Sequence, residues 1–258
     1  MYFCSKITFK VKKIITIIIG VCLSISAQAY TIVIDAGHGG KDPGALGFFS
    51  MEKNVNLAVA KELGRLIEQN CQGTKVVYTR KTDVFVELYE RAQIANRAKA
   101  DLFISIHANS TAAGTKGTTT SGTETYTLGM HRAAENLAVA KRENTVITLE
   151  SNFEQKYEGF DPNSSESYII FELMQDQNMA ASVEFAQEIQ KQFRTTAKRA
   201  DRGVHQAGLL VLARTSMPAV LVELGYINNR TEEKYMNSKE GISALAKSIY
   251  NAFVAYKK

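Results

Sequence analysis

The chain has 258 residues, of which 45% are hydrophobic and 22% are charged. This balance is typical of a folded globular protein and excludes an intrinsically disordered chain, which would be poorer in apolar residues. The net charge of +5 includes four lysines within the first 29 residues; without them, 27 basic side chains face 26 acidic ones, so the charge gives no reason to expect a nucleic-acid partner.

The first 29 residues have the three parts of a secretory signal peptide. Lysines lie near the start, an apolar run covers residues 14–25, and residues 27–29 read Ala-Gln-Ala. The core of this run, residues 14–23, is about half as long as the roughly 20 residues that a membrane-spanning helix needs. We therefore predict a signal peptide over residues 1–29, cleaved after residue 29, with no stable membrane span afterwards. A lipid anchor at Cys22 is a weaker alternative because the bulky Val21 precedes it.

Cleavage would leave residues 30–258 as an exported chain with a single cysteine. Cys4 and Cys22 leave with the signal peptide, so Cys71 has no partner and no disulfide framework is expected. A chain of this length buries roughly 70–75% of its unfolded surface, so its hydrophobic core is sufficient to hold it together.

The first half of the mature chain alternates short apolar runs with segments of helical periodicity. A β-branched run predicts a strand over residues 31–35, which ends in a Gly-rich turn that contains His38. Apolar residues at helical spacing predict a helix over residues 52–69. The next expected elements are a strand over 75–79, a helix over 87–99 and a strand over 102–106.

The second half continues the alternation with longer irregular segments. Residues 111–122 are rich in Thr, Gly and Ala and predict a loop, and residues 145–167 are irregular and polar. The expected elements are strands over 123–128, 209–213 and 219–224, and helices over 132–142, 168–194 and 242–254. No repeat or linker marks a second domain, so we predict one α/β domain with a mostly parallel, twisted central sheet flanked by helices.

Two histidines and two glutamates are the residues best placed for chemistry. His38 and His107 each follow a predicted strand, and ligands of open α/β sheets bind outside the carboxyl ends of the strands. Glu52 lies in the first turn of a predicted helix, where the helix dipole favours a carboxylate. Glu223 ends the apolar run 220–222, where a lone buried carboxylate is costly unless it has a partner.

Two imidazoles and one carboxylate form the ligand set of a catalytic zinc that keeps one position open for water. A further carboxylate can take a proton from that water and pass it to a leaving amine. Each residue also has a simpler explanation: a hydrogen-bonded turn histidine, a first-turn helix glutamate, or an ion-paired core glutamate. Spacing alone therefore predicts a metal site without assigning the four roles.

Four ordered motifs resemble those of the zinc-dependent N-acetylmuramoyl-L-alanine amidases, the bacterial cell-separation type. They read VIDAGHGG and DPGA over residues 33–45, EKNVNL over 52–57, SIHAN over 105–109 and PAVLVELGYINN over 218–229. The Thr79-Arg80 pair and the helix that contains Arg91 also fit the pattern. The resemblance covers residues 31–255, essentially the whole mature chain.

This resemblance implies a phosphorylase/hydrolase-like fold, one Zn²⁺ per chain and peptidoglycan as the substrate. It implies His38, Glu52 and His107 as the zinc ligands and Glu223 as the catalytic carboxylate. The bond cleaved would join the lactyl group of N-acetylmuramic acid to the L-alanine of the stem peptide. Further candidates for substrate contact are Asn109, Arg80, Arg91 and His205. For the two arginines, structural roles are at least as favoured as substrate contact. His131 is expected to be a solvated residue at the start of a helix.

Two other readings of the same residues remain open at this point. A zinc carboxypeptidase would use the same ligand set, but it needs a positive group for the free carboxylate of its substrate. A non-catalytic, zinc-dependent wall-binding protein would leave Glu223 unexplained. No residues remain for an appended wall-binding module, which favours a diffusible, monomeric enzyme of the periplasm.

Residues 145–167 suggest that the enzyme is regulated, because long connections in compact domains are commonly lids or functional insertions. Several relatives of the resembling family carry an inserted segment here that covers the zinc cleft until a partner displaces it, which suggests an activator protein; in this chain the segment is short and departs from a long blocking helix. Glu150, Glu154 and Glu158 are the carboxylates of this segment that could approach the open zinc position. The alternative is a solvated surface loop.

Overall fold

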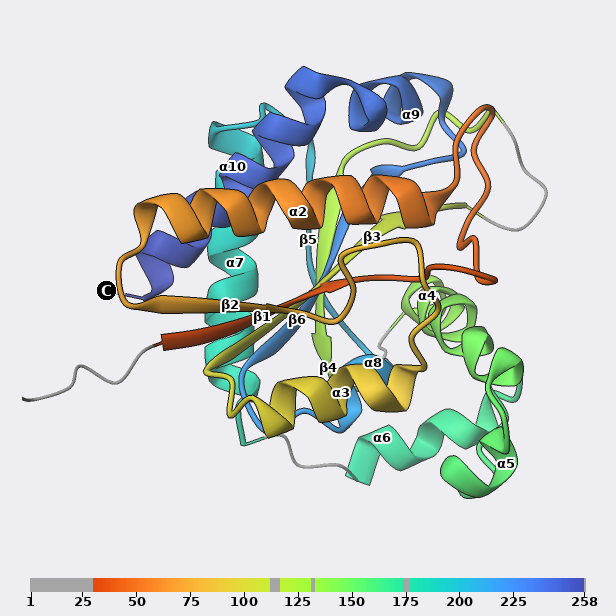
Figure 1. Cartoon of the computed structure of the whole chain (residues 1–258). Helices are drawn as coiled ribbons and strands as arrows, with labels where there is room; N and C mark the ends of the chain where they lie inside the picture. The colour runs from red at the N-terminus through yellow and green to blue at the C-terminus, as the bar shows by residue number, and fades with distance from the viewer. Residues whose placement is uncertain (1–29, 112–116, 131–132, 174–176, 258) are drawn as a thin grey trace, which may run out of the picture.

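The computed structural model describes residues 30–111, 117–130, 133–173 and 177–257. The predicted signal peptide, with Cys22, lies outside the described residues, and so does His131. A single central sheet with helices on both faces organises the described chain (Figure 1). Within the described ranges, none of the helices combines the length and the hydropathy needed to cross a membrane.

The sheet has six strands in the order β2-β1-β3-β6-β4-β5. Neighbouring strands are parallel except for β4 and β6, which are antiparallel. Figure 1 shows the sheet strongly twisted. The strands are β1 (Tyr30–Ala36), β2 (Thr74–Tyr78), β3 (Leu102–Asn109), β4 (Thr123–Leu128), β5 (Asp201–Ala207) and β6 (Ala219–Tyr226). The predicted α/β fold with a mostly parallel sheet is confirmed.

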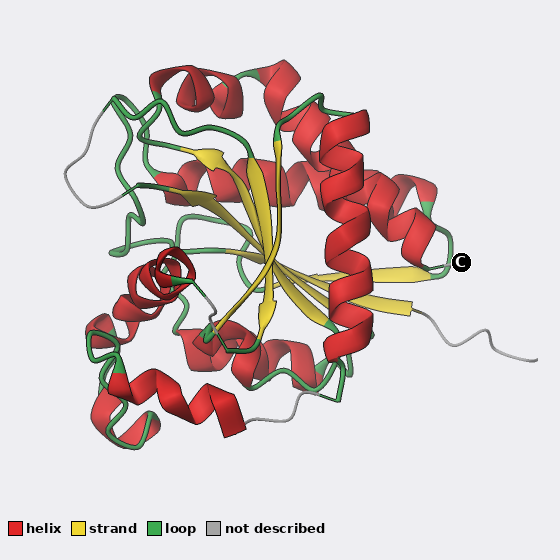
Figure 2. Cartoon of the chain, turned by 180° about the vertical axis from the view of Figure 1, so that it is seen from behind, coloured by secondary structure: helices red, strands yellow, loops and turns green. Residues whose placement is uncertain are grey.

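Helices cover both faces of the sheet, and Figure 2 shows the same layers from behind. One face packs against α2 (Glu52–Asn70), α7 (Met179–Thr195) and α10 (Lys239–Tyr256). The other face carries α3 (Leu88–Arg97), α4 (Ala134–Asn144), α8 (Leu210–Ala213) and the short helices η1 (Thr145–Leu149), α5 (Phe153–Lys156), η2 (Glu166–Ile169) and α6 (Ile170–Leu173). Strand side chains alternate between these cores, as Ile34 and Val33 of β1 do, because successive residues of a strand point to opposite faces.

Two elements of the second half differ from the prediction. The apolar run 209–213, predicted as a strand, contains the short helix α8 (Leu210–Ala213). The prediction was wrong because periodicity cannot separate a short buried helix from a short buried strand. The edge strand next to β4 is instead β5. Its residues are mostly polar and half-exposed, so its sequence has no apolar run that would have predicted a strand. The predicted helix 168–194 is also interrupted: α7 begins only at Met179, and η2 and α6 precede it.

Two further differences concern connections. Helix α9 (Arg230–Asn237) was not predicted, although Asn229 caps it by accepting hydrogen bonds from the backbone N–H groups of Thr231 and Glu232. Residues 145–167 are not an open loop, since they contain η1 and α5 and bury Ile147 and Tyr157 in the core under α3. This segment is therefore a packed part of the domain.

Candidate metal centre and active site

His38 lies in the turn after β1 with a strained backbone conformation. Its φ angle of 61° lies in the left-handed region, which a non-glycine residue adopts only when its surroundings enforce it. Arg80 and Arg91 provide that support by donating hydrogen bonds to the carbonyl oxygens of Ala36, Gly37 and His38 at 2.8–2.9 Å. The two arginines thus hold the turn that presents the His38 imidazole.

Arg91 is buried and forms an ion pair with Asp35, with Nη1 2.7 Å from Oδ1. The hydroxyls of Thr79 and Ser105 also donate to the Asp35 carboxylate at 2.6 Å. Burial alone would raise the pKa of Asp35, but Arg91 and the two hydroxyls outweigh it and hold that pKa below its ordinary value. Since both Arg80 and Arg91 are buried against backbone oxygens, their placement favours the structural role over substrate contact.

Glu52 is the first residue of α2, and a tightly fixed turn precedes it. The buried Glu233 accepts hydrogen bonds from the backbone N–H groups of Phe48, Phe49 and Ser50 at 2.8–2.9 Å. The backbone N–H of Ala45 in turn donates to Glu52 Oε2 at 2.8 Å. These contacts fix both the start of the helix and the orientation of the Glu52 carboxylate.

His107 and Glu223 lie within their strands rather than just beyond them. They are opposite each other in the register of the parallel pair β3–β6, so their side chains lie on the same face of the sheet. Gly37 makes room for the imidazole, because a Cβ atom there would lie 2.3 Å from His107 Nε2. A glycine is therefore required at this point of the turn that carries His38.

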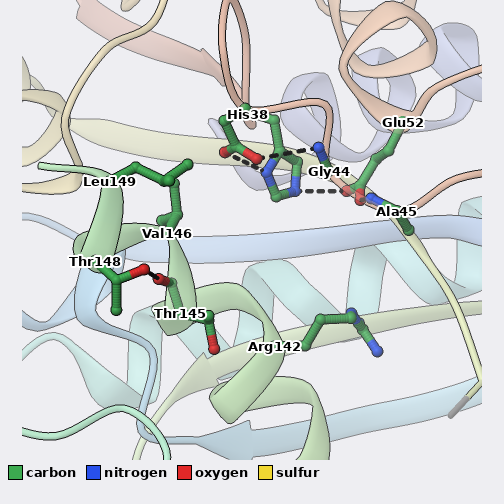
Figure 3. A pocket seen from close by; sticks show the side chains of 10 residues that line it. His38, Gly44, Ala45, Glu52, Arg142, Thr145, Val146, Thr148 and Leu149 are labelled. Carbon is green, nitrogen blue, oxygen red and sulfur yellow. Dashed lines mark hydrogen bonds and ion pairs between the residues drawn. The ribbon is translucent and has the colours of Figure 1, made fainter. Parts of the chain in front are cut away.

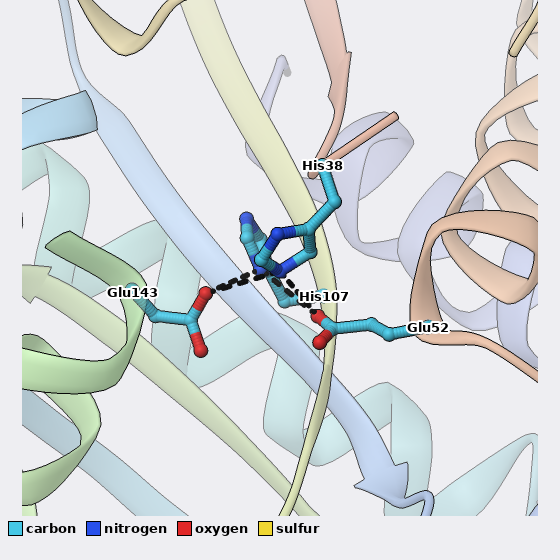
Figure 4. Close-up of side chains that lie close together, drawn as sticks. All are labelled: His38, Glu52, His107 and Glu143. Carbon is cyan, nitrogen blue, oxygen red and sulfur yellow. Dashed lines mark hydrogen bonds and ion pairs between the residues drawn. The ribbon is translucent and has the colours of Figure 1, made fainter. Parts of the chain in front are cut away.

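The structure brings His38, Glu52 and His107 together, as the sequence predicts, and adds Glu143 from α4 (Figure 4). Glu52 Oε1 lies 3.1 Å from both His38 Nε2 and His107 Nδ1. On the opposite side, Glu143 Oε2 lies 3.3 Å from His38 Nε2 and 2.9 Å from His107 Nδ1. One ligand atom from each of the four buried residues lies within 4.8 Å of all the others.

This donor set fits a metal ion. Within the described chain, His38 Nε2 and Glu143 Oε2 are buried without a hydrogen bond, which is costly unless a cation supplies the missing interaction. Asp42 Oδ2 lies 2.7 Å from His38 Nδ1 and orients the ring so that Nε2 faces the cluster. A carboxylate behind the imidazole in this way is typical of metal-ligating histidines. Imidazole and carboxylate ligands suit zinc, and four ligands suit its tetrahedral coordination.

Without a metal, the cluster would hold protons. Burial favours neutral imidazoles, but the carboxylates of Glu143 and Glu52 raise the pKa of His107 to about 9. Burial also opposes a charged His38, yet Glu52, Asp42 and Glu143 raise the pKa of His38 well above its ordinary value. The cluster therefore attracts positive charge strongly, and a metal ion would compete with protons for the same nitrogens.

Glu143 takes the position that we predicted for Glu150, Glu154 or Glu158, and that prediction is wrong. Glu150 accepts hydrogen bonds from the backbone N–H of Leu88 and from the Tyr157 hydroxyl, away from the cluster. Glu154 and Glu158 are exposed. Nothing in the sequence distinguishes Glu143 as a site residue, because a charged residue near the end of a helix is normally solvated. Its position beside the two histidines follows only from the packing of α4 in the folded domain.

Arg142, the neighbour of Glu143, contacts the predicted catalytic carboxylate. Its Nη2 atom lies 3.5 Å from Glu223 Oε1, and its Nε donates to Glu143 Oε1 at 3.0 Å. Glu223 is buried, and burial together with the nearby charge of Glu143 raises its pKa well above the ordinary value. Helix α4 thus places a carboxylate at the cluster of potential metal ligands and a guanidinium at Glu223.

Arg142 lines two cavities. The smaller, of 260 Å³, is also lined by His38, Glu52 and residues of η1 (Figure 3). The larger, of 1160 Å³, is lined by Asn109 and His205, two of the predicted substrate-binding residues. Arg80 and Arg91 are not among the lining residues of either cavity.

Comparisons with known proteins agree with this geometry. The family model described as N-acetylmuramoyl-L-alanine amidase matches residues 32–255. The amidase AmiA of Escherichia coli is 31% identical over 228 residues, which cover 87% of this chain and 75% of that protein. The uncharacterized protein YqiI of Bacillus subtilis is 32% identical over 229 residues, which cover 89% of this chain and 85% of that protein.

Solved structures give the same result. The N-acetylmuramoyl-L-alanine amidase of Clostridium difficile 630 has a TM-score of 0.66 and 27% identity, over 90% of this chain and 98% of that chain. The catalytic domain of the amidase CwlV from Bacillus (Paenibacillus) polymyxa has a TM-score of 0.64 and 30% identity, over 88% and 98%. By its sequence and its fold, the chain belongs to the N-acetylmuramoyl-L-alanine amidase family.

Proposed function

We propose that this chain is a peptidoglycan hydrolase with a zinc ion held by His38, Glu52 and His107 and with Glu223 as its catalytic carboxylate. The substrate bond is the amide between the lactyl group of N-acetylmuramic acid and the L-alanine of the stem peptide. The observation that carries the proposal is the register of β3 and β6, which sets Glu223 beside His107 within the cluster of potential metal ligands.

When bound, zinc supplies Lewis-acid polarisation of the carbonyl and lowers the pKa of water at its open position. Asp42 and the backbone contacts of Arg91 keep the His38 imidazole oriented toward the cluster. Glu223 takes a proton from the attacking water and gives it to the departing alanine nitrogen. Burial is the main cause that raises the pKa of Glu223, and a carboxylate with a raised pKa holds the transferred proton more readily before returning it.

We further propose that the arrangement seen here is a closed state. Glu143 offers a fourth ligand atom beside those of His38, Glu52 and His107, and a zinc ion held by all four would keep no open position for water. Arg142 at the same time contacts Glu223, with Nη2 3.5 Å from Oε1. Both contacts come from the end of α4, so displacement of this one helix end would free the metal position and the base together. The predicted activator protein would act by that displacement, and the predicted export to the periplasm would bring the chain to its substrate.

Product analysis on purified peptidoglycan tests the proposed reaction. The wild type and Glu143→Ala, each supplied with zinc, are incubated with wall material and the soluble products are identified by mass spectrometry. An amidase releases intact stem peptides with a free L-alanine amino terminus. A carboxypeptidase releases terminal amino acids, and a wall-binding module releases nothing; either result would refute the proposal.

A further inference from the structure

The larger cavity lies beside β6, the strand that carries Glu223. Its walls are α4 on one side and the sheet on the other, where Glu124 and Tyr126 of β4, Arg202 and His205 of β5, and Tyr226 of β6 face it. Glu124 is opposite Glu223 in the antiparallel register of β4 and β6. The cavity therefore begins one strand away from the proposed base.

The Glu124 carboxylate is fully occupied. Its Oε1 accepts from Arg202 Nε at 2.6 Å and from the Tyr226 hydroxyl at 2.8 Å. Its Oε2 accepts from the Tyr126 hydroxyl at 2.7 Å and from Asn109 Nδ2 at 3.0 Å. A carboxylate has about four acceptor sites, so Glu124 has little capacity left for a ligand. Its role is to hold the groups around it.

Among the groups that donate to Glu124, Arg202 is the one whose side chain can also contact a ligand in the cavity. Only its Nε edge is directed at Glu124, and its guanidinium lies over the Tyr226 ring, 5.4 Å from the centroid. The side chain is 42% exposed and lines the cavity. Guanidinium has four further N–H groups on its two terminal nitrogens. A fork that is already fixed in orientation is well suited to bind a carboxylate through two parallel hydrogen bonds.

We propose that Arg202 binds a free carboxylate of the stem peptide and determines specificity for it, an inference that rests on the proposed function. Arg202 lines the same cavity as Arg142, the residue that contacts Glu223, so a stem peptide that is cleaved at Glu223 and extends along this cavity passes the Arg202 guanidinium. The free carboxylate nearest the cleaved bond belongs to the second residue of the stem peptide. That residue is a D-glutamate linked through its γ-carboxyl group, which leaves its α-carboxylate free.

Paired substrates test this assignment. N-Acetylmuramoyl-L-alanyl-D-glutamate with its γ-carboxyl group capped as the methylamide carries only the free α-carboxylate, and its D-isoglutamine counterpart, capped in the same way, carries a neutral amide of the same shape. We expect the wild type to prefer the acid by about tenfold or more in kcat/KM, as a charged hydrogen-bonded pair would require. Arg202→Gln should lose this preference, and Arg202→Lys should restore part of it. Arg194→Gln is the matched control, because Arg194 forms an exposed ion pair with Asp201 at the start of the same strand.

Binding provides a readout that does not depend on turnover. The product L-alanyl-D-glutamate, with its γ-carboxyl group capped as the methylamide, is titrated into the zinc-loaded wild type and Arg202→Gln by calorimetry, with the D-isoglutamine form, capped in the same way, as the comparison. Weaker binding of the acid alone by Arg202→Gln supports the assignment. An equal acid-to-amide ratio in the wild type, or the wild-type ratio retained in Arg202→Gln, would overturn it. If the wild type cleaves neither substrate while Arg202 still discriminates the products, the proposed reaction fails and the carboxylate site stands.

Discussion

His107 and Glu223 are opposite each other in neighbouring parallel strands, so one register places a potential metal ligand beside a potential base. Because side chains alternate along a strand, a slip by one residue would turn one of the two to the opposite face of the sheet. Strand pairing in the buried centre of the sheet is a stable way to fix such a relationship. The turn that carries His38 and the start of α2 that carries Glu52 then complete the cluster from outside the strands.

Zinc binding should release protons. His107 has a pKa of about 9 in the metal-free protein and the pKa of His38 is also raised, because Glu52, Glu143 and Asp42 face the imidazoles. Both imidazoles therefore hold a proton to higher pH than an ordinary histidine, and zinc must displace such protons to bind. We expect the release of protons on zinc binding and an affinity that rises with pH. Calorimetry in buffers of different ionisation enthalpy measures both; an affinity that stays constant between about pH 6 and 8 would contradict this account.

Removal of the Glu143 carboxylate should activate the enzyme. If the closed state outweighs the open state by ten to one, Glu143→Ala should raise basal wall hydrolysis about tenfold at unchanged zinc content. Glu154→Ala is the matched control, because Glu154 is exposed and belongs to the neighbouring helix α5. Dye release from labelled peptidoglycan gives the rate. Equal or lower activity in a folded, zinc-loaded Glu143→Ala protein would show that Glu143 does not restrain the site.

Asp35 should matter for stability rather than for chemistry. Asp35→Asn leaves the buried Arg91 without its counter-charge, which costs about 3–5 kcal/mol in the free energy of unfolding. Asp83→Asn, which removes an exposed partner of Lys53, should cost about 0–1 kcal/mol. Urea unfolding followed by circular dichroism compares the two variants, and equal losses would argue against the account.

The pH dependence of that stability follows from the lowered pKa of Asp35. A carboxylate with a lowered pKa in the folded state stabilises the protein fully above its unfolded pKa of about 3.9. This contribution disappears as the pH falls through the lower folded value. Urea midpoints of the wild type should therefore fall in this acid range more steeply than those of Asp35→Asn; parallel curves would contradict the assignment.

The apolar runs of the central strands made most of the fold predictable. Residues 31–35, 102–106 and 219–224 are buried on both faces, and their continuous hydrophobic pattern signals such strands directly. Strand β5 lacks this pattern because it lies at the sheet edge with mostly half-exposed side chains. For the short helix α8 the error was the reverse: a strand was predicted where there is a helix. Its residues are apolar and mostly buried, and hydrophobicity alone does not distinguish a short buried helix from a strand.

The sequence predicted those site residues that lie near strand ends or within the family's motifs. His38, Glu52 and His107 belong to segments whose meeting point follows from a parallel sheet. Glu143 and Arg142 reach the site only through the docking of α4, a long-range packing event without a local signal. Arg202 was missed for a similar reason: its orientation depends on Glu124, a residue 78 positions away.

The most direct test of the account is wall digestion by the wild type and Glu223→Gln, each with and without a chelator, with bound zinc measured on the same samples. Glutamine preserves the size of Glu223 but cannot exchange a proton. We expect the wild type to release stem peptides only without chelator, and Glu223→Gln to retain its zinc and release none. His107→Ala, run in parallel, should lose the metal. Normal digestion by zinc-loaded Glu223→Gln, or normal zinc content in His107→Ala, would contradict the central claim.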